Sequence, residues 1–587
     1  MSQTLYHSVE RNAQMLVALL KAKGIRRVIA SPGTTNITFV WSVQQDSFFE
    51  VFSAVDERHA AYLACGMAAE SGEPVVITCT GATASRNYFP GLTEAHYRKL
   101  PILAVTAMQS LNRVGHLSPQ ALDRSTPPAD TVIESVVCRV PQTDADAHAC
   151  FLSINKALIA LTRHGGGPAH INLETFYSSD FSVQELPAIK PIEYVTVTAK
   201  QWPEIPRDKR IAIWIGSHAL FSKDETRAIE AFASQYNAVV IKDHTSGYYG
   251  ASAVNAALLC SQGIGSNSKF ANLIPEFLIH LGEVSGDYPS IRLARVSDFV
   301  WRVARDGELR DTFGKLTAIF EMAEVDFFGH YTSSSNGIGE DSDFAKSWQK
   351  ATQEVREKIP ELPFSNPWIA SQLAPQLPAG SVLHLAILNS LRSWNLFPLP
   401  KDVVAYSNVG GFGIDGCVST MIGASLASPQ KRFFTVVGDL AFFYDLNALG
   451  NRHCGKNMRI LLINNASGSE FHIYSHPAAK FGEAAGAYIA ADGHYGNGSR
   501  NLVRHYVEDL GLEYRSADSK ESFTEQLVWF LGDSEHSLVL ECFTTPSDES
   551  DAQKLLNTIE VPPQSSRSKV TSMLPSSVKS VIKRVIQ

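Results

Sequence analysis

Short runs of apolar residues recur along the chain, separated by longer stretches in which small, polar and apolar residues are mixed. Apolar runs of about four to eight residues, bounded by Gly, Pro, Asn or Asp, are typical of buried strands. The stretches between them are long enough to form helices. Strands that alternate with helices predict parallel sheets with right-handed crossovers, so we expect an α/β protein.

The clearest apolar runs fall into three groups along the chain. The first group contains Arg27–Ala30, Val51–Val55, Pro74–Thr80, Pro101–Ala107 and His170–Glu174. The second contains Arg210–Gly216 and Ala238–Asp243, with a helix expected to begin at Lys223. The third contains Ser381–Ile387, Val403–Ser407, Arg432–Gly438, Met458–Asn464 and His536–Thr544. We expect each group to form its own parallel sheet.

Proline-rich stretches separate the three groups. Leu186–Pro206 contains four prolines, and Pro360, Pro363 and Pro367 mark a second linker. A chain of 587 residues is also too long for one hydrophobic core. These boundaries predict domains at residues 1–185, 186–358 and 359–550, followed by a tail at 551–587.

Composition narrows the class of protein without identifying it. A hydrophobic content of 44% and a charged content of 19% are ordinary for a globular protein, and the net charge of −8 gives no reason to expect nucleic acid as a partner. The eight cysteines are scattered without a CxxC pair, which predicts reduced thiols. The chain shows no signal-peptide pattern and no apolar run of about 20 residues, so we expect a cytoplasmic protein.

The stretch from Val436 to Phe471 is the most informative part of the chain. One apolar strand ends at Gly438-Asp439, and the next ends at Asn464-Asn465. Parallel strands joined by a crossover would bring the carboxylate of Asp439 and the amide of Asn465 to the ligand-binding edge of a sheet. Carboxylate and amide oxygens suit Mg²⁺, which takes its remaining ligands from water and phosphate. The pattern therefore predicts a magnesium-diphosphate site.

Glu57 is a second candidate for chemistry. It follows a predicted strand and opens a helix rich in small residues. An acid at a helix start is favoured electrostatically in any protein, so alone it indicates little. Combined with Asp439 and Asn465, however, it predicts a carboxylic acid that shares a proton with a heterocyclic ring nitrogen.

Several longer motifs resemble one family. SNVGGFGIDGCVST (407–420), GDLAFFYDLNAL (438–449), ASPGTTN (30–36) and DERHAAYLACGMA (56–68) are similar to segments of thiamine diphosphate (ThDP) enzymes of the decarboxylase/synthase superfamily, above all to the SEPHCHC synthase (MenD) family. The resemblance extends over nearly the whole chain. It implies pyrimidine-binding, central and diphosphate-binding domains in that order, and a homodimer or homotetramer with active sites between subunits.

The resemblance also assigns roles to single residues. Glu57 would hydrogen-bond the aminopyrimidine ring, and Ile414 would support the bent shape of the cofactor. The remaining cofactor contacts would come from Asp439, Asn465 and the carbonyl of Ser467 for Mg²⁺, and from backbone amides near Gly438, Leu440 and Ala441 for the diphosphate.

Other matched residues point to the substrate. Gln120 matches a glutamine that contacts substrate, and Asn389-Ser390 match a pair that lines the pocket. Taken alone, Gln120 reads as a surface residue and Asn389-Ser390 as a helix cap. His116, His472 and His476 are either proton-transfer residues or structural ones.

The departures from the family concern its basic residues. The family has Ser-Arg after SPG, where this chain has Thr34-Thr35. The family also has TADRP, and the corresponding segment of this chain has Met108-Gln109-Ser110 in place of its last three residues. SNRG becomes SNVG at Val409, a central Lys-Arg pair becomes Asp287-Tyr288, and the basic residue after Asn389-Ser390 is Arg392. Each charge-assisted bond contributes about 1.5–3 kcal/mol, so loss of several should abolish tight binding of the family's dianionic substrates.

These features predict a ThDP/Mg²⁺ enzyme that decarboxylates a 2-oxo acid, with pyruvate as the first guess, and transfers the acyl carbanion to an unknown acceptor. Arg113, Arg392 or Lys99 would contact the donor carboxylate. Two alternatives stay open: a simple decarboxylase that releases an aldehyde, and a catalytically silent binding subunit. No GxGxxG fingerprint is present, so FAD is not expected.

The last 23 residues, Ser565–Gln587, are rich in Ser and Pro and end in a segment with apolar residues on one helical face and basic residues beside it. Two interpretations stay open, a disordered or subunit-packing tail and a basic amphipathic helix on a membrane surface.

Overall fold

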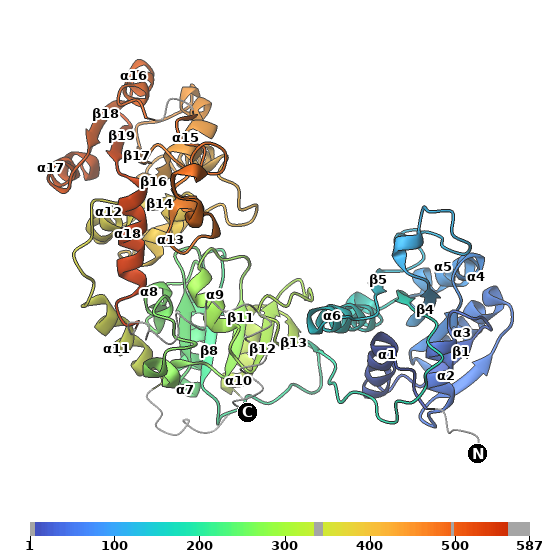
Figure 1. Ribbon diagram of the computed structural model, residues 1–587. Coiled ribbons are helices and arrows are strands. Elements are labelled where there is room, and N and C mark those ends of the chain that lie inside the picture. Colours follow the sequence, from blue (N-terminus) through green and yellow to red (C-terminus); the bar gives the residue numbers. More distant parts are fainter. Residues whose placement is uncertain (1–5, 334–343, 495–497, 562–587) are drawn as a thin grey trace, which may run out of the picture. The chain divides into compact units, whose positions relative to one another are not determined.

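The computed structural model describes residues 6–333, 344–494 and 498–561 (Figure 1). The chain forms two compact units, one of residues 1–195 with 308–319 and one of residues 196–307 with 320–587. The predicted amphipathic tail helix lies outside the described residues. Within those residues, no helix is long and apolar enough to cross a membrane.

The first unit contains a six-stranded sheet in the order β2-β1-β3-β4-β6-β5, in which every neighbouring pair is parallel. Its strands are β1 (Arg27–Ala30), β2 (Glu50–Ser53), β3 (Val75–Cys79), β4 (Ile102–Met108), β5 (Glu134–Cys138) and β6 (Ala169–Glu174). Its helices are α1 (Arg11–Ala22), α2 (Ile37–Gln44), α3 (Glu57–Ser71), α4 (Thr83–Asn87), α5 (Phe89–Arg98) and α6 (Asp144–Ala160). One apolar core joins the sheet to α1, α2 and α6, and another joins it to α3 and α5.

The second sheet has the order β10-β9-β8-β11-β12-β13-β7. Its strands are β7 (Glu193–Thr196), β8 (Ile211–Ile215), β9 (Val239–Lys242), β10 (Ala253–Asn255), β11 (Phe277–Leu281), β12 (Phe299–Ala304) and β13 (Leu316–Glu321). The helices that follow them are α7 (Lys223–Tyr236), α8 (Ala257–Cys260), α9 (Tyr288–Ala294), α10 (Glu324–Ser333) and α11 (Phe344–Arg356). The predicted start of α7 at Lys223 is confirmed, and Ser222 and Glu225 form its capping box.

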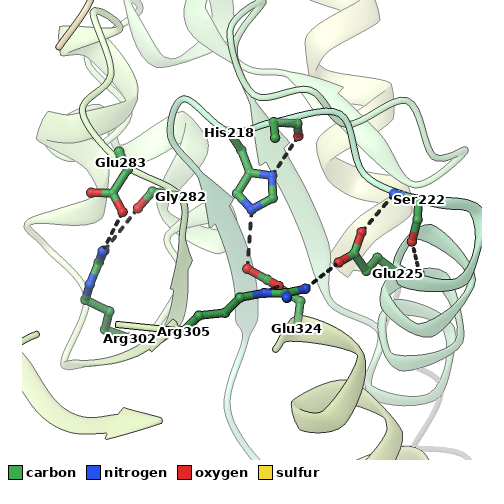
Figure 2. A network of polar contacts seen from close by, with 9 residues as sticks. His218, Ser222, Glu225, Gly282, Glu283, Arg302, Arg305 and Glu324 are labelled. Carbon is green, nitrogen blue, oxygen red and sulfur yellow. Dashed lines mark hydrogen bonds and ion pairs between the residues drawn. The ribbon is translucent and has the colours of Figure 1, made fainter. Parts of the chain in front are cut away.

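A polar network occupies the carboxyl edge of this second sheet (Figure 2). His218, which follows β8, lies 3.3 Å from Glu324 and 2.7 Å from the carbonyl of Ala219. Arg305 contacts both Glu225 and Glu324. The buried Arg302 donates to the carbonyl of Gly282 at 3.0 Å and to Glu283 at 3.2 Å. These contacts join the loops after β8, β11 and β12 to the starts of α7 and α10.

The third sheet has the order β15-β14-β16-β17-β19-β18, again with every neighbouring pair parallel. Its strands are β14 (Val382–Leu385), β15 (Val404–Tyr406), β16 (Phe433–Gly438), β17 (Met458–Asn464), β18 (Glu513–Ala517) and β19 (Leu538–Phe543). Its helices are α12 (Asn366–Leu373), α13 (Asn389–Asn395), α14 (Cys417–Ala427), α15 (Asp439–Tyr444), α16 (Leu502–Asp509), α17 (Lys520–Leu531) and α18 (Pro546–Asn557). The predicted fold class is confirmed: it is α/β, with three consecutive parts of the chain that each form a parallel sheet.

Candidate active site

Asp439 and Asn465 lie at the same edge of the third sheet. Asp439 directly follows β16 and Asn465 directly follows β17, and these strands are neighbours with Gly438 opposite Ile463. In a parallel pair both strands end at the same edge, so the structure brings the two side chains together, as the sequence pattern predicts.

The carboxyl group of Asp439 is buried, with 2% of the residue exposed. The backbone N–H of Leu440 donates to it at 2.9 Å. Burial raises the pKa of Asp439 to about 7, although the amides of Leu440, Ala466 and Ser467 act in the opposite direction. Burial disfavours the charged form of this carboxylate, and a cation beside it would favour that form.

Asn465 and Ser467 supply oxygens that have no partner. Both residues are buried, and neither Asn465 Oδ1 nor Ser467 Oγ accepts or donates a hydrogen bond among the described residues. The carbonyl of Ser467, the predicted ligand, accepts from the N–H of Ser469 at 2.9 Å and keeps a second lone pair. One carboxylate with unpartnered neutral oxygens beside it is a donor set that fits a hard divalent cation.

Hydrogen bonds of Asn464, Glu541 and Tyr514 support the turn that carries these oxygens. Ala466 adopts φ +60°, a conformation unfavourable for a residue with a Cβ. Its N–H donates to Asn464 Oδ1 at 3.2 Å, and Asn464 Nδ2 donates to the buried Glu541 at 2.7 Å. Tyr514 donates to the other oxygen of Glu541 at 2.7 Å. This network fixes a strained turn, which is how functional loops are commonly held.

The other predicted cofactor residues lie around this edge. Gly438 caps α15, and Leu440 and Ala441 form the first turn of that helix, where the Leu440 amide is already used by Asp439. Ile414 lies half-buried in the loop before α14 and packs against the core of the third sheet. The glycine that ends this loop, Gly416, has φ +90°, which favours glycine.

Glu57 opens α3 in the first unit. The preceding Asp56 caps the helix by accepting from the amides of Arg58 and His59. Glu57 is half-exposed, and Asn87 of α4 donates to its Oε2 at 3.3 Å. Gln120 is exposed in a turn with φ +64°.

A cavity of about 230 Å³ in the second unit gathers several of the predicted substrate residues. It is lined by Asn389 and Arg392 of α13 and by Asp287 and Tyr288 at the start of α9. Asn389 lies 2.9 Å from Ser469 Oγ, and Ser390 beside it is buried. Sequence reasoning missed Glu470 at this cavity. Its position, five residues after Asn465 on the same turn, is the signal that places it there.

Two acids and two arginines line this cavity. Arg392 forms an ion pair with Glu470 and lies 4.6 Å from the ring centre of Tyr288. Burial, and then the neighbouring Asp243, raise the pKa of Asp287 to about 7. The cavity therefore presents a buried acid and two arginines, of which Arg392 is paired with Glu470 and Arg292 acts on Asp287.

The remaining candidates lie in both units. Arg113 and His116 are exposed, and Lys99 precedes β4, so it lies at the amino edge of the first sheet, away from Glu57. His472 is half-buried, 3.8 Å from Asp492. His476 caps the following turn by accepting from the Ala478 amide. His476 also lines the cavity that contains Asn389 and Arg392.

The comparisons with known proteins identify the class. Residues 11–126 match the family described as "Thiamine pyrophosphate enzyme, N-terminal TPP binding domain". Together with the three parallel sheets and the donor set at Asp439, this match defines the chain as a thiamine diphosphate-dependent enzyme, of the transferase or lyase type.

Curated relatives are similar along most of their length. The chain is 29% identical over 572 residues to 2-succinyl-5-enolpyruvyl-6-hydroxy-3-cyclohexene-1-carboxylate synthase of Bacteroides fragilis, which covers 93% of this chain and 98% of the relative. The enzyme of the same name from Bacteroides thetaiotaomicron is 29% identical, with the same coverage, and that of Desulfotalea psychrophila is 28% identical over 90% of this chain and 97% of its own. The predicted similarity to the SEPHCHC synthases is thus confirmed.

Proposed function

We propose that this enzyme decarboxylates a small 2-oxo acid, with pyruvate as the first candidate, and transfers the acyl group to an acceptor with formation of a carbon–carbon bond. The observation that carries the proposal is a contrast within one unit. Asp439, Asn465 and Ser467 offer a carboxylate and unpartnered oxygens that suit Mg²⁺, whereas the cavity beside Asn389 holds the buried acid Asp287 and two arginines, one of them paired with Glu470.

Different residues would bind the metal, the cofactor and the substrate. Asp439, Asn465 and the carbonyl of Ser467 would hold Mg²⁺, and Glu57 would hold a proton against the pyrimidine ring. Thiamine diphosphate supplies a carbon nucleophile and an electron sink when it is bound. Asn389 and Ser390 orient the substrate from the start of α13, and Gln120 contacts it from the first domain. We infer a homodimer or homotetramer with active sites between subunits, as the resemblance implies.

The same contrast argues against a SEPHCHC synthase. A 2-oxo diacid and isochorismate carry four carboxylates in total, two on the donor and two on the acceptor. The chain has Thr35, Gln109 and Val409 at positions where the resembling family has arginines that would contact them. Purified protein with ThDP and Mg²⁺ should therefore form no product from 2-oxoglutarate plus isochorismate. Robust product formation would refute this part of the proposal.

A panel of 2-oxo acids tests the reaction itself. Products identified by mass spectrometry should be ligated ketones or hydroxyketones, alone with donor or with added aldehydes and oxo acids. Free aldehyde as the sole product would favour the simple decarboxylase. Absence of any product, with no thermal stabilisation by ThDP and Mg²⁺, would favour a silent subunit, because a ligand that binds the native state must stabilise it.

A further inference from the structure

Arg124 is a buried arginine without a charge partner. Only 6% of the residue is exposed, and its Nε and Nη1 atoms make no hydrogen bond among the described residues. No carboxylate in that part of the chain forms an ion pair with it. A guanidinium is always charged, and a buried charge without a partner is strongly unfavourable. An anion bound at this position would compensate the charge of Arg124.

The guanidinium lies where three strands of the first sheet end. A Cβ added at Gly81, just after β3, would lie 2.4 Å from Arg124 Nη1 and 3.2 Å from the carbonyl of Ala107 in β4. Thr35, after β1, donates to that carbonyl at 3.1 Å and accepts from the Gly81 amide at 3.3 Å. A side chain at position 81 would therefore displace the guanidinium from this place.

The space beside Arg124 contains no compensating charge. A cavity of about 20 Å³ is lined by Arg124, Thr106, Tyr88 and His170. Burial, and then Arg124 itself, lower the pKa of His170 to about 3, so its ring is neutral. The volume admits about one water molecule. A carboxylate would reach Nε and Nη1 only if the loop from Leu117 to Asp123 moved.

This arginine lies close to Glu57. Arg86 of α4 donates to the carbonyl of Asp123 at 2.8 Å, and the next residue, Asn87, donates to Glu57. Burial raises the pKa of Cys79 to about 12, with Glu57 raising it further and Arg124 lowering it, so both groups act on one buried thiol. Arg124 and Glu57 thus belong to the same edge of the sheet.

We propose that Arg124 binds the carboxylate of the substrate in the first domain and replaces the basic side chains that are absent at Thr35 and Gln109. One guanidinium matches one carboxylate in a bidentate pair, so the substrate class is a 2-oxo monocarboxylic acid rather than a diacid. This inference rests on the proposed function and names the residue that selects its substrate.

The test compares Arg124→Gln and Arg124→Lys with Arg459→Gln in the ThDP/Mg²⁺-loaded enzyme. Arg459 is a matched control because it is equally buried, but its guanidinium donates to the carbonyls of Lys456, Met458 and Gly532. With the best 2-oxo acid of the panel, Arg124→Gln should raise KM about 10- to 100-fold. Arg124→Lys should raise KM less, and Arg459→Gln should lower the Tm without changing KM.

Thermal stabilisation by ThDP and Mg²⁺ should stay the same in both Arg124 variants, which shows that they fold. An unchanged KM in a folded Arg124→Gln enzyme overturns the inference. If the wild type converts no 2-oxo acid, the proposed function fails, and acetate binding then decides the inference separately. At constant ionic strength acetate should raise the Tm of the wild type and not that of Arg124→Gln. An equal effect on both, or no effect on the wild type, overturns the inference.

Discussion

Arg392 of α13 and Glu470, in the segment after β17, form an ion pair at the mouth of the cavity in the second unit, and Tyr288 of α9 lies under the same guanidinium. Both charged side chains are largely buried, with 23% and 19% exposed. With Tyr288, the pair links α13 and the segment after β17 to the start of α9.

Because this pair is mostly shielded from water, removal of one partner leaves a charge uncompensated. Arg392→Gln and Glu470→Gln should each lower the apparent Tm by several degrees, and the double variant should lose less than the sum of the two. Differential scanning calorimetry of the four proteins in the cycle measures this coupling. Strictly additive losses would show that the pair contributes nothing.

Asp439→Asn should remove stabilisation by ThDP and Mg²⁺ while leaving the apoprotein as stable as the wild type or more so. Burial disfavours the charged carboxylate, and the amide keeps the size of the side chain without the charge that a cation needs. The measurement is the Tm with and without ThDP and Mg²⁺ at millimolar concentration.

Asp445→Asn is the matched control for that experiment. Asp445 is also a buried aspartate of the third domain, but it accepts from the amide and hydroxyl of Ser419. This control should lower the Tm of the apoprotein and keep the ligand-induced rise. A ligand-induced rise that survives in Asp439→Asn would remove Asp439 from the metal site.

Glu57→Gln should bind ThDP with little change but slow the loss of the proton from the thiazolium carbon by about 10²- to 10⁴-fold, the usual contribution of a positioned acid or base. Exchange of that proton for deuterium, followed by quenched-flow NMR, needs no substrate. Glu94→Gln serves as control, since Glu94 is a half-buried residue of α5 paired with Arg98. Normal exchange in Glu57→Gln would contradict the assignment.

His218 should make stability depend on pH. Burial lowers its pKa, but the hydrogen bonds to Glu324 and to the carbonyl of Ala219 outweigh burial and raise the pKa above 6.5. A raised pKa in the folded state means that the stabilisation is present below about pH 6.5 and is lost as the pH rises through the folded value. Glu225, Glu324 and Arg305 are the charged groups around it (Figure 2).

The Tm difference between wild type and His218→Gln should therefore shrink as the pH rises from about 6 to about 8. This range is chosen because the ordinary histidine pKa is about 6.5. His505→Gln, an exposed residue of α16, should show a constant difference over the same range. A constant difference for His218→Gln as well would mean that the ring stays neutral.

The central strands of the first and third sheets were predicted, because they are buried and read as apolar runs, whereas β11 and β12 of the second sheet were not. Arg27–Ala30 and Met458–Asn464 match β1 and β17 residue for residue. Two edge strands, β5 and β18, were not predicted. β5 (ESVVC) and β18 (EYRSA) are only partly buried, so their polar residues hide the strand pattern. The strand predicted at Val51–Val55 begins and ends earlier, at Glu50 and Ser53, also on an edge.

The sequence by itself determined the cofactor, because Asp439 and Asn465 each follow a strand whose apolar run is plain, and parallel pairing then brings the two ends together. Only the tertiary structure decided which charges are available to a substrate. Arg392, a sequence candidate for the donor carboxylate, is paired with Glu470, 78 positions away, whereas Arg124 is buried beside Gly81 with two free nitrogen atoms. Charge pairing depends on residues that are distant in the sequence, and the packing of the folded chain sets it.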